Sequence, residues 1–316
     1  MARALAFLFF WCGIAAQPAS ADDEQVRIIR EVPFVAAEPG SYRLASELTY
    51  EMQSGAAITV AADHVTVDLN DKTIRGTGGA ATAAIGILAV DRQNLTIRHG
   101  RVSGFYFGID IRSTDRGAQT SSRHSISDIT LDRNWYFGMR VVGARSTVAD
   151  CRILDTGGSS KPGHTIPHGV RLVGANNILQ NCCVYDLRLQ RFADGKGEIV
   201  GAHFDDARGG VCENNHFIEP AHAADAMFDA EDRRARRFGI WINGGPRNDT
   251  FLRVSGNVFR GFTVPVAFAP GSDGVVEHNT FIDADTEPIR GKPASQSADN
   301  STAAGGEQAA CPPIAP

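Results

Sequence analysis

The sequence has few of the features that mark zinc proteins, disulfide scaffolds, helical bundles or nucleic-acid binders. Only six of its 316 residues are cysteine, and no CxxC pair or Cys/His spacing typical of a metal site occurs. The formal net charge is 31 − 36 = −5, which argues against general nucleic-acid binding. Four methionines and few long helical patterns favour an all-β fold over a bundle.

The first 21 residues are typical of a secretory signal peptide. Arg3 supplies a positive end, residues 4–16 are apolar but too few to span a bilayer, and Ala19-Ser20-Ala21 is a small-residue cleavage site. No later segment reaches transmembrane length. We therefore expect cleavage after Ala21 and a mature protein that is periplasmic or secreted.

The C-terminal residues 289–316 are rich in alanine, glycine, serine and proline and show no periodicity. This composition predicts a disordered tail, which contains Cys311. The five cysteines outside the signal peptide are too few for a disulfide scaffold in a chain of this size.

Between residues 55 and 288 the chain repeats two short units, each with the alternating pattern of a strand. The first unit begins with a small residue, as in FGIDI (107–111), FGMRV (137–141) and HGVRL (168–172). The second unit lies between successive copies of the first, as in STVADCRI (146–153) and GVCENNHF (210–217). Short strands at this spacing, without intervening helices, are typical of a solenoid of parallel strands.

One turn position of the second unit holds a column of similar residues. Asn215, Asn257 and Asn279 recur there in adjacent coils, and asparagine at a turn can adopt the left-handed conformation and hydrogen-bond its stacked neighbour. Cys151 and Cys182 take the same position in earlier coils. They form either a disulfide or a pair of buried free thiols, and both alternatives are open.

These repeats make the chain similar to the right-handed parallel β-helix proteins of the pectate-lyase-like superfold. The resemblance covers about residues 40–288 and implies an all-β, single-stranded parallel β-helix, a solenoid with loop insertions that form a cleft wall. Residues 39–76 are similar to the capped first coil of exported β-helix proteins. We expect residues 22–54 to form the N-terminal cap and first strands, and residues 55–288 to form the β-helix itself. The superfold contains lyases, epimerases, hydrolases and non-enzymes, so it leaves the reaction open.

Alternation along the first unit predicts which of its side chains face solvent. Two arginines rarely stack directly in a structural sheet, because like charges repel. Two interpretations follow: aspartates neutralise the arginines in a solvated ladder, or an anionic ligand lies over them. The first outward column is Leu88, Asp110, Arg140, Arg171, His203 and Trp241, and the next is Val90, Arg112, Val142, Val173, Asp205 and Asn243.

Long insertions precede the first unit in three consecutive coils, at residues 156–168, 188–200 and 219–237. Because they occupy the same position in the coil, we expect them to stack as one wall of a cleft beside the outward columns. Two of their residues, Lys161 and His168, are candidates for substrate binding.

A groove lined by arginines, a histidine and a tryptophan predicts an anionic polysaccharide as partner, with uronic acids as its carboxylated sugars. Arg140 and Arg171 would stabilise the charge that develops on the carboxylate, and His203 would remove the C5 proton. Expulsion of the 4-linked oxygen then gives a lyase, which we favour, and reprotonation from the other face gives a C5-epimerase. The predicted substrate-binding residues are Asp110, Arg112, Lys161, His168, Asp205, Trp241 and Asn243.

The chain resembles uronate-acting β-helix lyases and alginate C5-epimerases, although the DPHD motif of the epimerases is absent and the nearest stretch is HFDD (203–206). Asp205 and Asp206 are candidate ligands for calcium, the cofactor typical of pectate lyases. A glycoside hydrolase needs two nearby carboxyl groups, whereas three coils, roughly 14 Å, separate Asp110 from Asp205. A non-catalytic glycan-binding or accessory role is a further alternative. We expect a monomer with no nucleic-acid partner and no membrane insertion.

Overall fold

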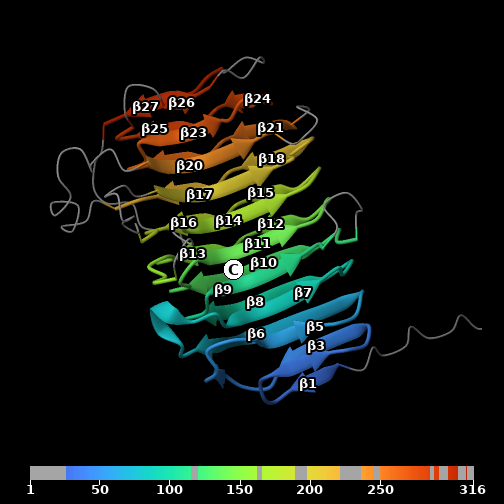
Figure 1. Ribbon diagram of the computed structural model, residues 1–316. Helices are drawn as coiled ribbons and strands as arrows, with labels where there is room; N and C mark the ends of the chain where they lie inside the picture. Colours follow the sequence, from blue (N-terminus) through green and yellow to red (C-terminus); the bar gives the residue numbers. More distant parts are fainter. Residues whose placement is uncertain are drawn as a thin grey trace, which may run out of the picture.

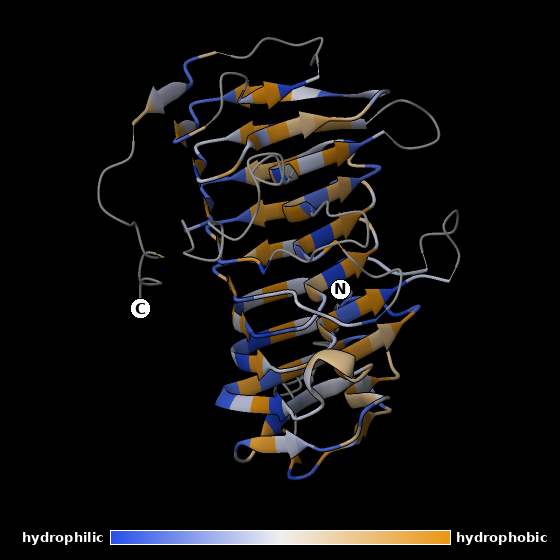
Figure 2. Cartoon of the chain, turned by 60° about the vertical axis from the view of Figure 1, so that its left-hand side comes forward, coloured by the Kyte–Doolittle hydropathy of each residue, from blue (hydrophilic) through white to orange (hydrophobic). Residues whose placement is uncertain are grey.

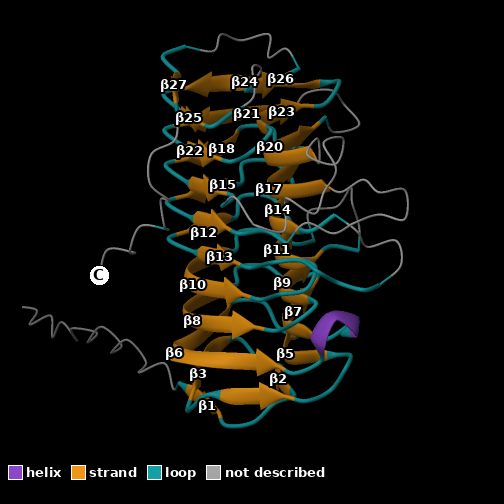
Figure 3. Cartoon of the chain, turned by 90° about the vertical axis from the view of Figure 1, so that its left-hand side faces the viewer, coloured by secondary structure: helices purple, strands orange, loops and turns teal. Residues whose placement is uncertain are grey.

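Each short strand of the repeat pairs with the equivalent strand of the next coil, so that the chain winds into a β-helix. The computed structural model describes residues 26–114, 120–161, 166–188, 198–220, 236–244, 250–284, 288–291, 298–304 and 311. The coils rise from the N-terminal strands to the C-terminal strands in Figure 1, and Figure 3 shows the strands stacked one above another with loops between the stacks. The predicted all-β parallel β-helix is confirmed. The predicted signal peptide lies outside the described residues.

The described strands form two parallel sheets, sheet A with 17 strands and sheet B with 10. The helical structure among the described residues is one 3-10 turn, Gly79–Ala81. Sheet B contains β2 (Phe34–Ala36), β5 (Ala56–Val60), β7 (Ile85–Val90), β9 (Phe107–Arg112), β11 (Phe137–Val142), β14 (His168–Val173), β17 (Glu198–Asp205), β20 (Arg236–Asn243), β23 (Val264–Phe268) and β26 (Ile289–Arg290).

The other strands of each coil belong to sheet A, and in the later coils a bend divides them into two short pieces. They are β1 (Arg27–Ile29), β3 (Gly40–Leu44), β4 (Leu48–Tyr50), β6 (Val65–Gly76), β8 (Thr96–Ser103), β10 (Ser125–Asp132), β12 (Thr147–Ala149), β13 (Arg152–Leu154), β15 (Ile178–Gln180), β16 (Cys183–Tyr185), β18 (Gly210–Glu213), β19 (His216–Ile218), β21 (Thr250–Ser255), β22 (Val258–Arg260), β24 (Ser272–Glu277), β25 (Thr280–Ile282) and β27 (Ser301–Ala303).

The core lies between the two sheets and is filled by the inward residues that alternation predicts. Ile109, Val141 and Ile240 are fully buried, and Leu172 is 1% exposed. Hydrophobic and hydrophilic residues alternate along many of the strands in Figure 2. Burial of one such side chain contributes roughly 1.5–3 kcal/mol, so the stacked coils stabilise one another through a continuous core.

The glycines of the first unit are required by the close approach of successive coils. A Cβ atom on Gly138 would lie 2.6 Å from the carbonyl oxygen of Gly169, and one on Gly169 would lie 2.6 Å from that of Gly201. A larger residue would push the coils apart. The regular glycine spacing in the sequence therefore has a steric cause.

The asparagine column forms a buried ladder of hydrogen bonds. The Oδ1 atom of Asn257 accepts from the backbone N–H of Asn215 at 2.9 Å, and Asn279 and Asn300 repeat this contact to the coil before them at 2.9 and 3.0 Å. The expectation that these asparagines adopt the left-handed conformation is wrong, because the preceding residue takes it, as Asn214 does with φ +55°. The ladder side chain is thus free to point inward.

The predicted disordered tail is wrong for the described residues beyond 288. Strand β27 pairs with β25, and β26 pairs with β23. Cys311 forms a disulfide with Cys183 and packs against Ile218 on the outer face of sheet A. Composition alone missed this segment, because its order depends on contacts with distant coils rather than on periodicity of its own.

Cys151 and Cys182 are buried free thiols, which decides between the two alternatives. The Sγ atom of Cys182 lies 3.5 Å from the backbone nitrogen of Cys151, in the position that an asparagine oxygen takes in later coils. Burial, reinforced by the neighbouring sulfur of Cys182, raises the pKa of the Cys151 thiol well above its ordinary value. Both cysteines therefore extend the ladder as small core residues.

Replacement of Asn257 by alanine should lower the free energy of unfolding by roughly 3 kcal/mol, because it leaves buried donors of the Asn215 side chain and backbone without an acceptor. Urea unfolding monitored by circular dichroism measures the change. Asn181→Gly is the control, since Asn181 is exposed and has φ +53°, which glycine adopts freely. Equal losses in both variants would contradict a special role for the ladder.

Peptide mapping of the native protein without reductant should recover a cross-linked peptide containing Cys183 and Cys311. Because the bond closes a separation of 128 residues, Cys311→Ser should lower stability by roughly 2–4 kcal/mol. Cys212→Ala offers a comparison in which a free buried thiol is removed and the cross-linked peptide survives. Recovery of Cys311 as a free thiol in native protein would contradict the pairing.

Candidate functional site

The first outward column lies in register on sheet B, as alternation predicts. Arg140 pairs with Asp110 on one side and with Arg171 on the other, Arg171 pairs with His203, and His203 pairs with Trp241. We call these five residues, one from each of β9, β11, β14, β17 and β20, the charged row. Asp205 and Asn243 are paired in the next outward column.

The two stacked arginines turn away from each other toward separate carboxylates. Arg140 donates to both oxygens of Asp110, at 2.8 and 3.0 Å. Arg171 donates twice to Oδ2 of Asp205, at 2.9 and 2.7 Å. Arg112 also donates to Asp110, at 2.5 Å. This geometry relieves the repulsion between the guanidinium groups, so the predicted ion-pair ladder is present.

The ladder does not neutralise the site. Three guanidinium groups, those of Arg112, Arg140 and Arg171, meet two carboxylates, those of Asp110 and Asp205, so these five side chains carry a net charge of +1. The side chains of Arg140 and Arg171 keep 24% and 33% of their surface exposed. An anion that lies over the row can therefore still contact both cations.

His203 is held on both sides by hydrogen bonds. Its Nδ1 atom lies 3.1 Å from Nε2 of His168, and its Nε2 atom lies 3.1 Å from Oδ1 of Asp205 and 3.1 Å from Nδ2 of Asn243. Trp241 in turn donates its indole N–H to Oδ1 of Asn243 at 2.8 Å. The network fixes the imidazole in one orientation at the edge of the row.

Two members of this network have strongly displaced pKa values. Burial alone would raise the pKa of Asp205, but the hydrogen bond and charge of His203, the charge of Arg171 and the hydrogen bond from Asn243 outweigh it and hold that pKa well below its ordinary value. Burial, followed by the nearby positive charges of His203 and Arg171, holds the pKa of His168 well below its ordinary value. Asp205 is therefore an anion and His168 a neutral imidazole.

Aromatic side chains border the row toward the N-terminal coils. The guanidinium of Arg140 lies 4.6 Å from the ring centre of Phe107, and Nζ of Lys161 lies 4.7 Å from the ring centre of Tyr106. Both cations thus rest on one aromatic cluster. Lys161 therefore lies beside the row. Its contact with Tyr106 could not be predicted from the sequence, where the two residues are far apart.

Tyr136 is a candidate that the sequence reading missed. Its ring stacks on Phe137 with centroids 4.2 Å apart and meets Phe107 edge-on. Burial raises the pKa of its phenol, while the nearby charges of Arg171 and Arg140 oppose that shift. Its position directly before the strand FGMRV (137–141) is the sequence feature that could have identified it.

Two of the predicted substrate-binding residues are buried in the structure. Asp110 is fully buried between its arginines, and His168 is 6% exposed and bonded to His203 and to the carbonyl of Ile166. Both side chains hydrogen-bond within the fold. Arg112, by contrast, keeps an exposed edge.

The candidate calcium ligands do not converge. Both oxygens of Asp205 are engaged by donors, and Asp206, which has φ +53°, pairs with Arg208 at 3.1 Å. Within the described residues no group of three His, Cys, Asp or Glu side chains is placed to hold a metal ion. Calcium binding by Asp205 and Asp206 stays a prediction.

The insertions occupy the predicted position in the coil, since each follows a strand of sheet A and precedes a strand of sheet B. Their central parts, residues 162–165, 189–197 and 221–235, lie outside the described residues, and so does the predicted cleft wall.

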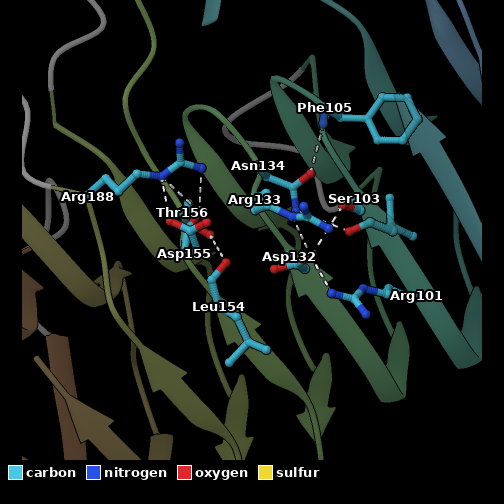
Figure 4. A network of polar contacts seen from close by, with 11 residues as sticks. Arg101, Ser103, Phe105, Asp132, Arg133, Asn134, Leu154, Asp155, Thr156 and Arg188 are labelled. Atoms are coloured by element: carbon cyan, nitrogen blue, oxygen red, sulfur yellow. Dashed lines mark hydrogen bonds and ion pairs between the residues drawn. The ribbon is translucent and has the colours of Figure 1, made fainter. Parts of the chain in front are cut away.

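A second polar network joins coils at the end of sheet A (Figure 4). Asp132 accepts hydrogen bonds from Arg101 and Arg133, and Asp155 pairs with Arg188 at 2.7 Å. The guanidinium of Arg188 also lies over a tryptophan ring. This network also holds three guanidinium groups and two carboxylates, and its ion pairs link successive coils.

The chain belongs to the family of right-handed β-helix proteins. A family model described as the right handed beta helix region matches residues 56–232, more than half of the chain. Among curated proteins no sequence matches it. Among the described residues, no helix is long and apolar enough to cross a membrane.

Some solved structures are similar to this chain at low sequence identity. DFA-IIIase from Arthrobacter chlorophenolicus in complex with DFA-III is 12% identical, with a TM-score of 0.46 over 84% of this chain and 64% of that one. An alginate lyase from Paenibacillus sp. is 10% identical, with a TM-score of 0.39 over 87% and 99%. This chain thus spans 64% of the length of the DFA-IIIase chain. These likenesses concern the fold and assign no reaction.

Stability should fall as the pH drops below about 6.5, where His168 of the unfolded chain takes up a proton and His168 of the folded chain does not. His168→Gln should reduce the slope of unfolding free energy against pH by up to one proton, about 1.4 kcal/mol per pH unit. Urea titrations between pH 6.5 and 4.5 measure it.

Burial lowers the pKa of His124 to about 4. This histidine should therefore maintain part of the slope of unfolding free energy against pH in the His168→Gln variant. His278→Gln is the matched control, because the side chain of His278 is 62% exposed. A slope unaltered by His168→Gln would contradict a neutral buried His168.

Proposed function

We propose that the chain is a carbohydrate-acting enzyme, a lyase that cleaves an anionic, uronate-containing polysaccharide by β-elimination. One observation carries the proposal: Arg140 and Arg171 are neighbours on one sheet face, with a net positive charge around them and His203 next in the row. A uronate carboxylate over the two arginines would bring the sugar C5 toward the imidazole. The polymer would run along the row, across successive coils.

The elimination uses groups that the row brings together. The arginines stabilise the negative charge that develops on the carboxylate as the C5 proton leaves. His203 takes this proton on Nε2 once the hydrogen bond from Asn243 to that atom opens, and Asp205 stabilises the imidazolium. The C5–H electron pair forms the C4=C5 double bond, and O4 leaves with the electron pair of the broken C4–O4 bond. We assign Tyr136 as the donor of a proton to O4, since its ring packs against Phe107 and Phe137 at the border of the row.

The alternatives differ in how well they use these groups. A C5-epimerase would share the first proton transfer and return a proton to the opposite face of C5. A glycoside hydrolase needs a carboxylic acid to protonate the leaving oxygen, but Asp110 and Asp205 are both ion-paired, which disfavours it. A non-catalytic glycan-binding protein would use the same cations without proton transfer.

The setting of the protein is part of the proposal. The disulfide between Cys183 and Cys311 supports function in an oxidising compartment, as a periplasmic or secreted protein. We propose a monomer that acts on the polymer without a nucleic-acid partner. Calcium is included as a variable in the assay below.

The direct test is ultraviolet absorbance with a panel of alginate, pectate, glucuronan and glycosaminoglycans, with and without calcium. We expect absorbance to rise as unsaturated uronate forms, and His203→Ala and Arg171→Ala to reduce the rate by at least about 100-fold. Arg253→Ala is the matched control, because it removes an exposed arginine from the outer face of sheet A.

Each other result has a defined meaning. New reducing ends without absorbance would replace the lyase by a hydrolase. An altered uronate configuration, seen by NMR of the polymer, would replace it by an epimerase. Binding without any product would leave a glycan-binding protein, and equal rates in wild type and both site variants would place the reaction elsewhere.

A further inference from the structure

The hydrogen bonds around His168 have a fixed direction. The carbonyl oxygen of Ile166 can only accept, so Nδ1 of His168, 2.9 Å away, carries a proton. Burial keeps this imidazole neutral, and its other nitrogen, Nε2, is therefore an acceptor. That acceptor faces Nδ1 of His203 at 3.1 Å, so Nδ1 of His203 must carry a proton.

The amide of Asn243 has a fixed direction for a similar reason. The indole nitrogen of Trp241 is only a donor, so the atom 2.8 Å from it is the amide oxygen of Asn243. The amide nitrogen then points the other way, 2.9 Å from Oδ1 of Asp205 and 3.1 Å from Nε2 of His203. Its two N–H groups suffice for both acceptors.

Nε2 of His203 consequently has a partner in either protonation state. When it carries a proton it donates to Asp205, and when it does not it accepts from Asn243. Among the described residues, the charged and titratable groups around His203 are Asp205 on β17 and His168 and Arg171 on β14, and β20 contributes the neutral Trp241 and Asn243.

We propose that His168 and Asn243 are positioning residues that hold a proton on Nδ1 of His203 and restrict proton exchange to Nε2. His168 is thereby assigned a supporting role rather than contact with substrate. The assignment of the tautomer depends only on the hydrogen bonds around His203. Its role in removing the C5 proton rests on the proposed function.

The tautomer can be measured without any substrate. Nitrogen-15 and proton NMR of the full chain labelled at histidine, with His203 assigned by the missing signals of His203→Gln, reports which ring nitrogen is protonated. We expect the neutral form of wild-type His203 to carry its proton on Nδ1. His168→Phe removes the acceptor, so the proton should move to Nε2, and His168→Gln should restore Nδ1 because the amide oxygen can accept.

Activity provides the second measurement once a substrate is found. His168→Phe should lower kcat more than it alters KM, by about tenfold or more, and should change the pH profile of kcat. His168→Gln should recover much of both. A structural defect alone would reduce the amount of folded protein without altering the pH profile of the folded fraction.

The outcomes separate the inference from the proposed function. A wild-type His203 protonated on Nε2, or a tautomer unaffected by His168→Phe, would overturn the inference even if the protein is a lyase. The expected tautomers in a protein that cleaves no uronate polymer would support the inference and reject the lyase. A changed tautomer with an unchanged pH profile would show that His168 does not position the base.

Discussion

The structure depends on one constraint, the in-register parallel pairing of each coil with the next. Backbone hydrogen bonds fix the register, so a side chain at a given position lies directly beside its equivalent in the neighbouring coil. The same constraint produces the glycine column, which permits close approach of the coils. It produces the asparagine ladder and the charged row as well. Stability and the candidate site therefore have a common origin.

In the charged row, ion pairs with aspartates orient two neighbouring arginine side chains and so reduce the repulsion between them. Two adjacent arginines would destabilise the sheet if they faced each other, but each is drawn toward a carboxylate on the opposite side. Asp110 forms ion pairs with two arginines, and Asp205 contacts Arg171 and His203. Both carboxylates are therefore paired with groups of the protein itself. The remaining positive charge is left at the surface, where it favours an anion.

Much of the site could be predicted from the sequence, because alternation has a period of two and the coil repeat sets the stacking. These rules predict Arg140 beside Arg171 and His203 beside Trp241, and the strand pairing confirms both positions. They could not show which way a long side chain turns. Lys161 contacts Tyr106, and Cys311 is bonded to Cys183. Local sequence patterns do not predict either contact, because the partners lie in distant segments.

The burial of the His168 side chain at the edge of the row could not be predicted from the sequence either. His168 belongs to a strand position whose neighbours, such as Phe137 and Val200, are apolar and covered, and the histidine there is buried with them. An exposed loop histidine and a buried supporting one look alike in a sequence. The hydrogen bond to Ile166 is what distinguishes them.

The claim that the row binds a carboxylated sugar can be tested most directly by an NMR titration with matched oligosaccharides. One member of each pair is a uronate oligomer, and the other is the same oligomer with its carboxylates reduced to alcohols. We expect only the uronate to bind, with shifts at His203 and at the side chain of Arg171, and with binding lost in Arg171→Ala. Equal binding of the two sugars, or shifts confined to other parts of the protein, would contradict an anion site at this row.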